Sequence, residues 1–161
     1  MTASQTQIEV SPRPSLVDAY LLNAPAMSAK GWKAWCDLIE PVMKLQHEYT
    51  MRTLFDDARA ERVQPWAIVD RDTDLVVGAM ATRVCTYQSG MTACIVMAGA
   101  TGGTNVTWEC MRSVLETVEA FAKDCGCDIL RIMGRPGWAR LFKDYKTTYI
   151  CLDKTLSEVQ S

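Results

Sequence analysis

The chain has 161 residues, the length of one domain with a sizeable core. Hydrophobic residues make up 48% of it and charged residues 22%, as in ordinary globular proteins. The formal net charge of -2 gives no electrostatic reason to expect a nucleic-acid partner. No apolar run approaches the roughly 20 residues that a membrane helix needs, so we expect no membrane partner either.

The first residues are expected to stand apart from the rest. Residues 1–13 are predicted to form a polar N-terminal arm, and residues 14–161 a single folded domain. The arm lacks the apolar centre of a signal peptide, so we expect no secretion by that route. Its one β-prone piece, Gln7–Val10, is suited to adding to an exposed sheet edge in another copy or another protein.

Seven cysteines are present, an odd number, mostly within apolar runs. There they act as small hydrophobic residues, which favours a reducing compartment over a disulfide framework. Cys125-Gly126-Cys127 has two interpretations, a metal or redox motif and a buried or helix-capping role. The single histidine, His47, is far away in sequence, so we expect the second role and no metal site.

Helices are expected first along the domain. Apolar residues in 14–46 recur at helical spacing, and Pro25 and Gly31 interrupt them, so two helices are predicted there. Thr50 is a good N-cap for a further helix over about 51–61.

A β region follows. Strands are predicted over 65–69, 75–87 and 91–98, separated by short polar turns. Gly78 within the second of them indicates a bulge. Because the connections are short, these strands should form an antiparallel meander.

The clearest amphipathic helix covers about residues 106–125. Thr104, Asn105 or Thr107 can cap its start, and Gly126 sits where a C′ glycine would end it. We expect the helix to pack on the sheet through apolar side chains at intervals of three and four: Val114, Leu115, Val118 and Phe121.

A strand over 129–133 should lie parallel to a strand of the meander, because a helix connects the two. Residues 134–137, Gly-Arg-Pro-Gly, are then expected to end that strand. A short helix is predicted over 138–143 and a last strand over 147–152.

Two features of the sequence are candidates for binding an anionic group. Gly102 and Gly103 lie between a strand and the start of the long helix, where backbone N–H groups can approach a pyrophosphate. The alternative, a flexible turn, is favoured because no basic residue is adjacent. Arg135 can hold a phosphate or carboxylate, although such an arginine more often pairs with a carboxylate or caps a helix.

Five short segments carry a family resemblance: 64–70, 77–82, 98–103, 134–140 and 144–146. Through them, from about residue 50 to residue 154, the chain resembles GNAT-fold proteins (the N-acetyltransferase superfamily) encoded by tailed bacteriophages. The resemblance implies a single-domain α/β (α+β) fold. Its mixed, bent sheet has an antiparallel meander followed by strand–helix–strand, with helices on both faces. It also implies acetyl-CoA as the cofactor, and partners among other phage virion proteins or a second copy. The location implied is the host cytoplasm and the virion.

The resemblance also assigns site residues. Members that bind acetyl-CoA hold its pyrophosphate with Gln or Arg, then x-x-Gly-x-Gly or Ala. Aligned on Gly102, the first position is Gly99 and the last is Thr104, so the pattern is half kept. The cofactor-binding candidates are Gly99, Thr101, Gly102, Gly103, Thr104 and Asn105. Many members protonate the leaving thiolate with a tyrosine after the fifth strand. Phe142 aligns there and cannot donate a proton, which leaves Tyr145 as the catalytic candidate.

Two functions follow from these residues. The half-kept turn and Phe142 favour a phage protein of virion structure or assembly whose acyl-CoA chemistry is weakened or lost. The alternative is an active acetyl-CoA-dependent N-acetyltransferase acting on an amine.

Overall fold

The computed structural model describes residues 16–45, 49–101, 108–133, 140 and 142–148. Its elements, in chain order, are β1 (Val17–Leu21), the short 3-10 helix η1 (Ala24–Ala26), α1 (Ala29–Met43), α2 (Met51–Arg59), β2 (Gln64–Asp70), β3 (Val76–Thr86), β4 (Thr92–Thr101), α3 (Trp108–Asp124) and β5 (Ile129–Ile132). No helix within these ranges is long and apolar enough to cross a membrane.

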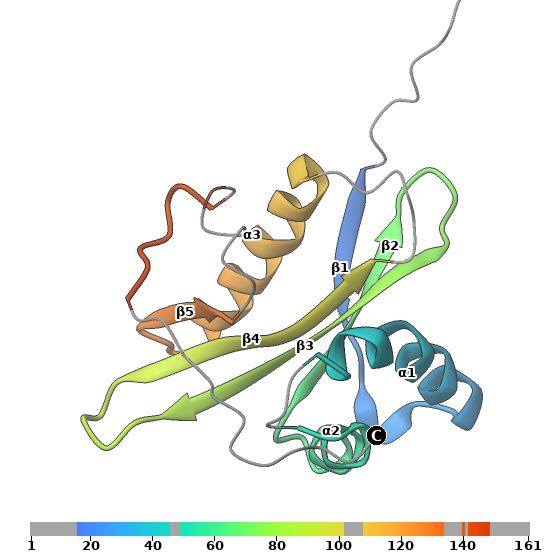
Figure 1. Cartoon of the computed structure of the whole chain (residues 1–161), viewed down its shortest axis with the longest axis horizontal. Coiled ribbons are helices and arrows are strands. Elements are labelled where there is room, and N and C mark those ends of the chain that lie inside the picture. Colours follow the sequence, from blue (N-terminus) through green and yellow to red (C-terminus); the bar gives the residue numbers. More distant parts are fainter. Residues whose placement is uncertain (1–15, 46–48, 102–107, 134–139, 141, 149–161) are drawn as a thin grey trace, which may run out of the picture.

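The five strands form one mixed sheet in the order β1-β2-β3-β4-β5 (Figure 1). Neighbouring strands from β1 to β4 are antiparallel, and β5 lies parallel to β4 after the α3 crossover. The expected bulge at Gly78 is confirmed, because the β2–β3 register shifts immediately beside it. The predicted architecture, a meander followed by strand–helix–strand, is therefore correct.

The prediction of a helix at the start of the domain is wrong, because Val17–Leu21 is the edge strand β1. Its partner β2 lies far along the chain, and long-range contacts decide its conformation. Arg71 Nε donates to Asp18 Oδ2 at 2.8 Å. On α3, the Ser113 hydroxyl donates to the Val17 carbonyl at 2.8 Å. None of these partners can be read from the local spacing of apolar residues.

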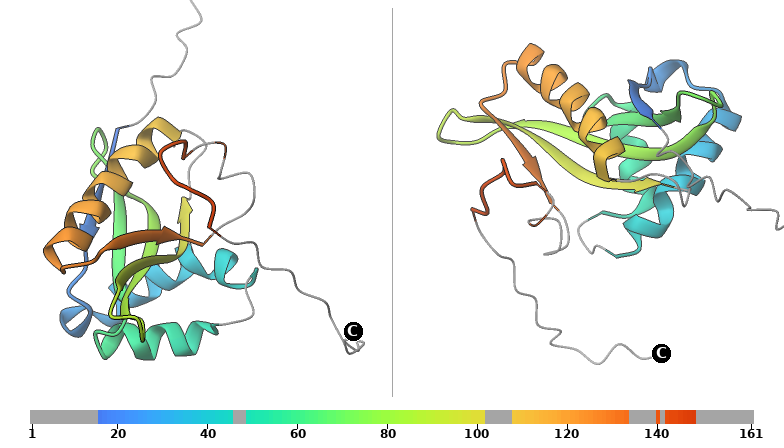
Figure 2. Two further views of the ribbon diagram at one scale, coloured as in Figure 1. Left: turned by 90° about the vertical axis from the view of Figure 1, so that its left-hand side faces the viewer. Right: turned by 90° about the horizontal axis from the view of Figure 1, so that it is seen from above.

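Helices cover both faces of the sheet, as predicted (Figure 2). On one face, α3 packs against β1, β2, β3 and β4 around the buried residues Trp66, Ile68, Met80, Val114 and Val118. On the other face, α1 packs on β3 and β4 with α2 beside it, around Trp35, Ile39, Leu54, Ala79 and Ala81.

Local capping signals set the ends of the helices. Ser28 caps α1 by accepting from the Gly31 N–H at 3.1 Å, so Gly31 lies in the first turn of a single helix and does not interrupt it. Thr50 caps α2 in the same way through the Thr53 N–H, as predicted.

The long predicted helix is confirmed as α3, with Val114, Leu115 and Val118 buried. Phe121 is half-buried and its ring meets that of Trp66 edge-on at 5.2 Å. Gly126 follows the helix with φ of 71°, the left-handed conformation expected of a C′ glycine. The cap candidates Thr104, Asn105 and Thr107 lie outside the described residues.

The two ends of the chain are described only in part. The predicted arm over 1–13 lies outside the described residues. So do half of the predicted helix over 138–143 and most of the predicted strand over 147–152. Of the described residues there, Arg140 has a 3-10 helical conformation, Phe142 and Lys143 lie in no helix, and Thr147 and Thr148 lie in no strand.

Replacing Met80 by Ala tests the core between the sheet and α3. The Met80 side chain is 1% exposed, so Met80→Ala should lower the free energy of unfolding by about 2–5 kcal/mol through lost burial and a residual cavity. Urea denaturation measures this loss. The matched control is Met91→Ala at a side chain that is 44% exposed, where we expect a change within about 0.5 kcal/mol. Equal losses in the two variants would contradict the packing described.

Candidate functional site

Strands β4 and β5 pair over a short stretch and then separate. Their parallel ladder ends where Val96 lies opposite Ile132. The Met133 N–H donates to the Val96 carbonyl at 3.2 Å, just after that pair. Strand β4 continues to Thr101 and pairs with β3 on both sides of Met97. Beyond the separation, no residue in the described part of the chain pairs with the β5-facing edge of β4.

A β-bulge lies at this same place. In the β3–β4 ladder Ala81 is opposite Ala98, but Thr82 is opposite Val96, so Met97 has no partner on β3. A bulge bends its strand and increases the local twist. It lies one residue after the last β4–β5 pair, where it turns the second half of β4 away from the line of β5 (Figure 1).

Two of the predicted cofactor-binding residues fall on this second half of β4. Gly99 lies opposite Met80, and a Cβ at Gly99 would be 3.7 Å from Met80 Cγ, an ordinary contact. Thr101 is the last residue of the strand. The other candidates, Gly102, Gly103, Thr104 and Asn105, lie outside the described residues, between Thr101 and the first residue of α3.

Beside the last β4–β5 pair, the sheet holds a small buried polar group on its α3 face. The Trp66 indole N–H donates to Thr82 Oγ1 at 2.9 Å, and Thr82 Oγ1 donates to Gln64 Oε1 at 3.3 Å. Cys94 lies next to Thr82, and burial raises the pKa of its thiol to about 12. Cys94 therefore stays a protonated thiol at neutral pH and is a poor nucleophile.

Tyr145, the predicted catalytic residue, is held against α3. Its hydroxyl donates to Glu119 Oε1 at 2.7 Å, and its ring lies 5.6 Å from that of Phe142. Burial and then the hydrogen bond to Glu119 raise the pKa of Tyr145 above its usual range. The phenol therefore keeps its proton at neutral pH, as a general acid must, but donates it to a carboxylate in this arrangement.

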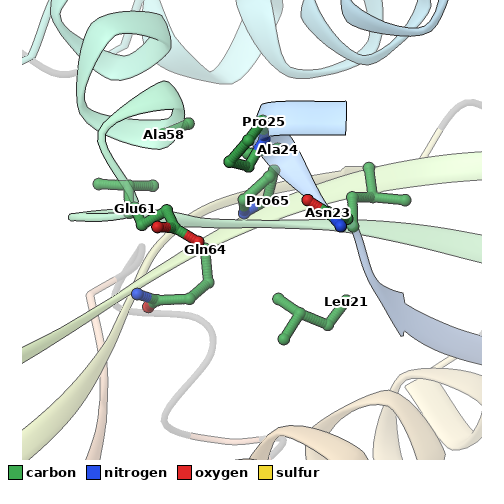
Figure 3. Close-up of a pocket in the computed structure, with 10 residues that line it drawn as sticks. Leu21, Asn23, Ala24, Pro25, Ala58, Glu61, Gln64 and Pro65 are labelled. Carbon is green, nitrogen blue, oxygen red and sulfur yellow. The ribbon is translucent and has the colours of Figure 1, made fainter. Parts of the chain in front are cut away.

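Two surface pockets lie elsewhere. Figure 3 shows one of about 300 Å³ between the end of β1, η1 and the end of α2, with Glu61 and Gln64 among its walls. Of the residues described there, none comes from β4 or β5. The second, of about 360 Å³, is lined by Trp32, Phe55 and Arg59 among others. Neither is adjacent to the strand separation, so we do not place the acyl-CoA chemistry in them.

This arrangement of strands and helices occurs in solved acetyltransferases. A probable acetyltransferase superposes with a TM-score of 0.63 at 8% identity, over 89% of this chain and 99% of its own. An aminoglycoside acetyltransferase from an uncultured soil metagenomic sample gives 0.64 at 8% identity, over 88% and 99%. A GNAT family acetyltransferase from Staphylococcus aureus gives 0.57 at 10% identity, over 88% and 99%. This chain has the GNAT acetyltransferase fold.

The likeness concerns the fold and not the sequence. No family model matches the chain, and no curated protein matches it. At these identities the GNAT fold does not by itself carry an activity over to this chain, because one fold hosts many functions.

In this fold, the first position of the family's acetyl-CoA-binding pattern lies on β4. Gly99 stands where the pattern has Gln or Arg, so no side chain at that position can reach a pyrophosphate. Arg135, the other anion-binding candidate, lies outside the described residues, as does His47. Among the residues that the structure describes, no group of three or more His, Cys, Asp or Glu could hold a metal ion.

The six cysteines in the described ranges are free thiols. Cys94 and Cys110 are buried, whereas Cys125 is exposed and Cys127 is half-buried at the end of α3. The capping in Cys125-Gly126-Cys127 is thus done by backbone groups and the left-handed glycine: the Cys127 N–H donates to the Ala122 carbonyl at 2.9 Å.

A double-mutant cycle measures how much the Tyr145–Glu119 hydrogen bond contributes to stability. We expect Tyr145→Phe to lower the free energy of unfolding at pH 7 by about 1–2 kcal/mol, because it removes a part-buried hydrogen bond to a charged group. Glu119→Gln and the double variant complete the cycle, and a coupling of about 1 kcal/mol is expected.

The same variants predict a pH dependence. The folded-state pKa of Tyr145 is raised, so its contribution to stability is complete below the unfolded value of about 10 and is lost as the pH rises above it. The stability difference between the wild type and Tyr145→Phe should therefore shrink between about pH 10 and pH 11 in urea titrations. A difference that stays constant over this interval would show that the phenol is not tied to Glu119.

Proposed function

We propose that this chain binds acyl-CoA and acts as an N-acyltransferase, with the donor held where β4 and β5 separate. The observation that carries the proposal is the end of the parallel ladder at Val96 and Ile132, while β4 runs on to Thr101. This places a free strand edge directly before Gly102 and Gly103 in the sequence, which precede α3.

The chemistry of the cofactor fits this edge. The pantetheine arm of CoA contains two amides, which donate and accept hydrogen bonds as a peptide strand does. Residues 97–101 of β4 offer matching backbone N–H and C=O groups, which need partners wherever water is excluded. The N-terminal end of α3 carries partial positive charge, which suits the pyrophosphate.

Bound acyl-CoA would supply an activated thioester. Residues of the chain would stabilise the charge that develops on it and protonate the leaving thiolate. Backbone N–H groups on the second half of β4 are the candidates for stabilising negative charge on the thioester oxygen. Tyr145 keeps the proton that a leaving thiolate needs. Delivering it requires the hydrogen bond to Glu119 to break, so we expect slow turnover rather than none.

A second candidate is a scaffold. The engagement of Tyr145 with Glu119 and the glycine at position 99 both favour a protein that keeps the fold while its acyl-CoA chemistry is weakened. The resemblance to phage-encoded proteins then suggests a role in virion structure or assembly, with self-association or other virion proteins as partners. Light scattering of the full chain and of a variant lacking residues 1–13 tests this role. A fall in particle mass in the variant supports it.

Calorimetry with acetyl-CoA tests the first proposal. We expect weak but saturable binding, because Gly99 offers no Gln or Arg side chain to the pyrophosphate. Gly103→Asp should abolish it by adding bulk and negative charge to the turn before α3.

The matched control is Ser89→Asp, which adds the same charge at the exposed β3–β4 turn and should leave the affinity unchanged. Release of CoA from acetyl-CoA in the presence of an amine, followed by chromatography, separates binding from turnover. No detectable heat with acetyl-CoA at any concentration would reject the enzyme and leave the scaffold. Equal binding by wild type and Gly103→Asp would move the site away from the turn.

A further inference from the structure

A row of residues crosses the sheet one position before the strand separation. Arg83 of β3 lies opposite Ile95 of β4, and Ile95 lies opposite Arg131 of β5. Side chains directly opposite one another share a face of a sheet. Tyr49, which directly precedes the α2 N-cap, contacts Arg83, so this face is the one that α1 and α2 cover further along.

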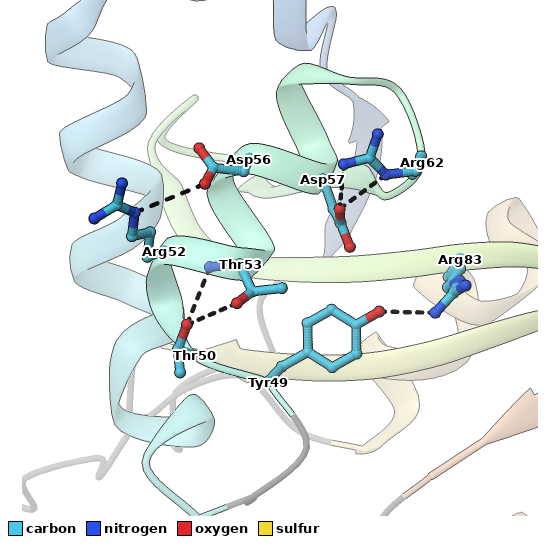
Figure 4. Close-up of polar contacts among 8 residues, drawn as sticks. All are labelled: Tyr49, Thr50, Arg52, Thr53, Asp56, Asp57, Arg62 and Arg83. Atoms are coloured by element: carbon cyan, nitrogen blue, oxygen red, sulfur yellow. Dashed lines mark hydrogen bonds and ion pairs between the residues drawn. The ribbon is translucent and has the colours of Figure 1, made fainter.

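A tyrosine hydroxyl orients Arg83. Its Nη1 donates to the Tyr49 hydroxyl at 2.7 Å (Figure 4). Five other cations in the described ranges pair with carboxylates: Lys33 with Asp37, Lys44 with Glu40, Arg52 with Asp56, Arg62 with Asp57, and Arg71 with Asp18. Arg83 forms no ion pair with any residue that the structure describes. A phenol fixes the direction of the guanidinium and leaves its full charge available to a ligand.

Arg131 is placed in a similar way. It donates to the Tyr87 hydroxyl, and its guanidinium lies over the Tyr87 ring at 5.3 Å from the centroid. Two tyrosine-oriented guanidinium groups thus flank the half-buried Ile95 on one face. In a chain with a net charge of -2, a guanidinium that a phenol orients, as Arg83 is, favours an anionic ligand.

This row is too far from the expected position of the CoA phosphates to bind them. From Ile95 to Thr101 is six residues of extended chain, or about 20 Å at roughly 3.3 Å per residue. The first residue of α3, Trp108, comes seven residues after Thr101. The row instead lies next to Val96 and Ile132, the point at which the reacting end of the donor would emerge under the proposed function.

We propose that the acceptor is an amine that also carries a carboxylate or phosphate group, and that Arg83 binds this group while the amine reaches the strand separation. The inference rests on the proposed function for the location of the reacting carbon. Arg83 is then a specificity-determining residue and Tyr49 a positioning residue. The half-buried Ile95 offers an apolar surface to the part of the acceptor between its two charged ends.

Matched acceptors test the inference. Ethanolamine and phosphoethanolamine differ by one phosphate, and propylamine and 4-aminobutyrate differ by one carboxylate. The first member of each pair is neutral apart from its amine. In acetyl transfer, we expect the anionic member of at least one pair to have the lower KM; the pair that responds tells phosphate from carboxylate recognition. Arg83→Gln should raise that KM on the order of tenfold or more, with little change for the neutral member. Tyr49→Phe keeps the charge and should raise it by a smaller factor.

The control is Arg52→Gln, which removes the same charge from a side chain that is 92% exposed on α2 and should leave every KM unchanged. A second readout does not depend on turnover: calorimetry of phosphoethanolamine and 4-aminobutyrate with the full chain in the absence of CoA. Wild type should bind at least one of them, and Arg83→Gln should bind it on the order of tenfold more weakly.

The two proposals fail separately. If acetyl-CoA does not bind but an anionic amine binds in an Arg83-dependent way, the donor site is wrong and the anion site stands. If acetyl-CoA binds and neutral and anionic amines are used equally, or Arg83→Gln binds the anions as tightly as wild type, the acceptor inference is overturned.

Discussion

Strand β4 pairs with two neighbouring strands, β3 and β5, and the second of them accompanies it for only part of its length. It pairs with β3 from Thr92 to Thr101 but with β5 only as far as Val96. The bulge at Met97 lets it do both, because an extra residue bends the strand where the second partner is lost. The direction of the free β4 edge beyond Val96 depends on this one irregularity.

Local signals were enough to predict most of the fold. The meander follows from short turns such as Asp70–Asp74, where the Asp70 carboxylate accepts from the backbone of Asp72 and Thr73. The α3 helix follows from its apolar periodicity. Strand β1 could not be found in this way, because the ion pair that helps to hold it joins Asp18 to a residue 53 positions away. Its apolar spacing fits a helix equally well.

Some residues of the candidate site could likewise be predicted from local sequence, and others could not. Gly99 and Thr101 were identified from a motif around them, and the structure places both on the free half of β4. Arg83 was not singled out, because only the cross-strand register brings it level with the separation. The contact of Tyr145 with Glu119 likewise depends on how the segment after β5 folds back on α3, which no spacing in the sequence encodes. The fold is thus better determined than the chemistry that it carries.

The central claim is that the β4 edge beyond Val96 receives the donor, and backbone amide chemical shifts test it most directly. In a titration of the labelled chain with acetyl-CoA, the amides of residues 97–101 should shift or broaden with one common affinity. The amides around the pocket beside η1, such as Ala24 and Glu61, should stay in place. Shifts confined to that pocket, with β4 unchanged at saturation, would contradict the account.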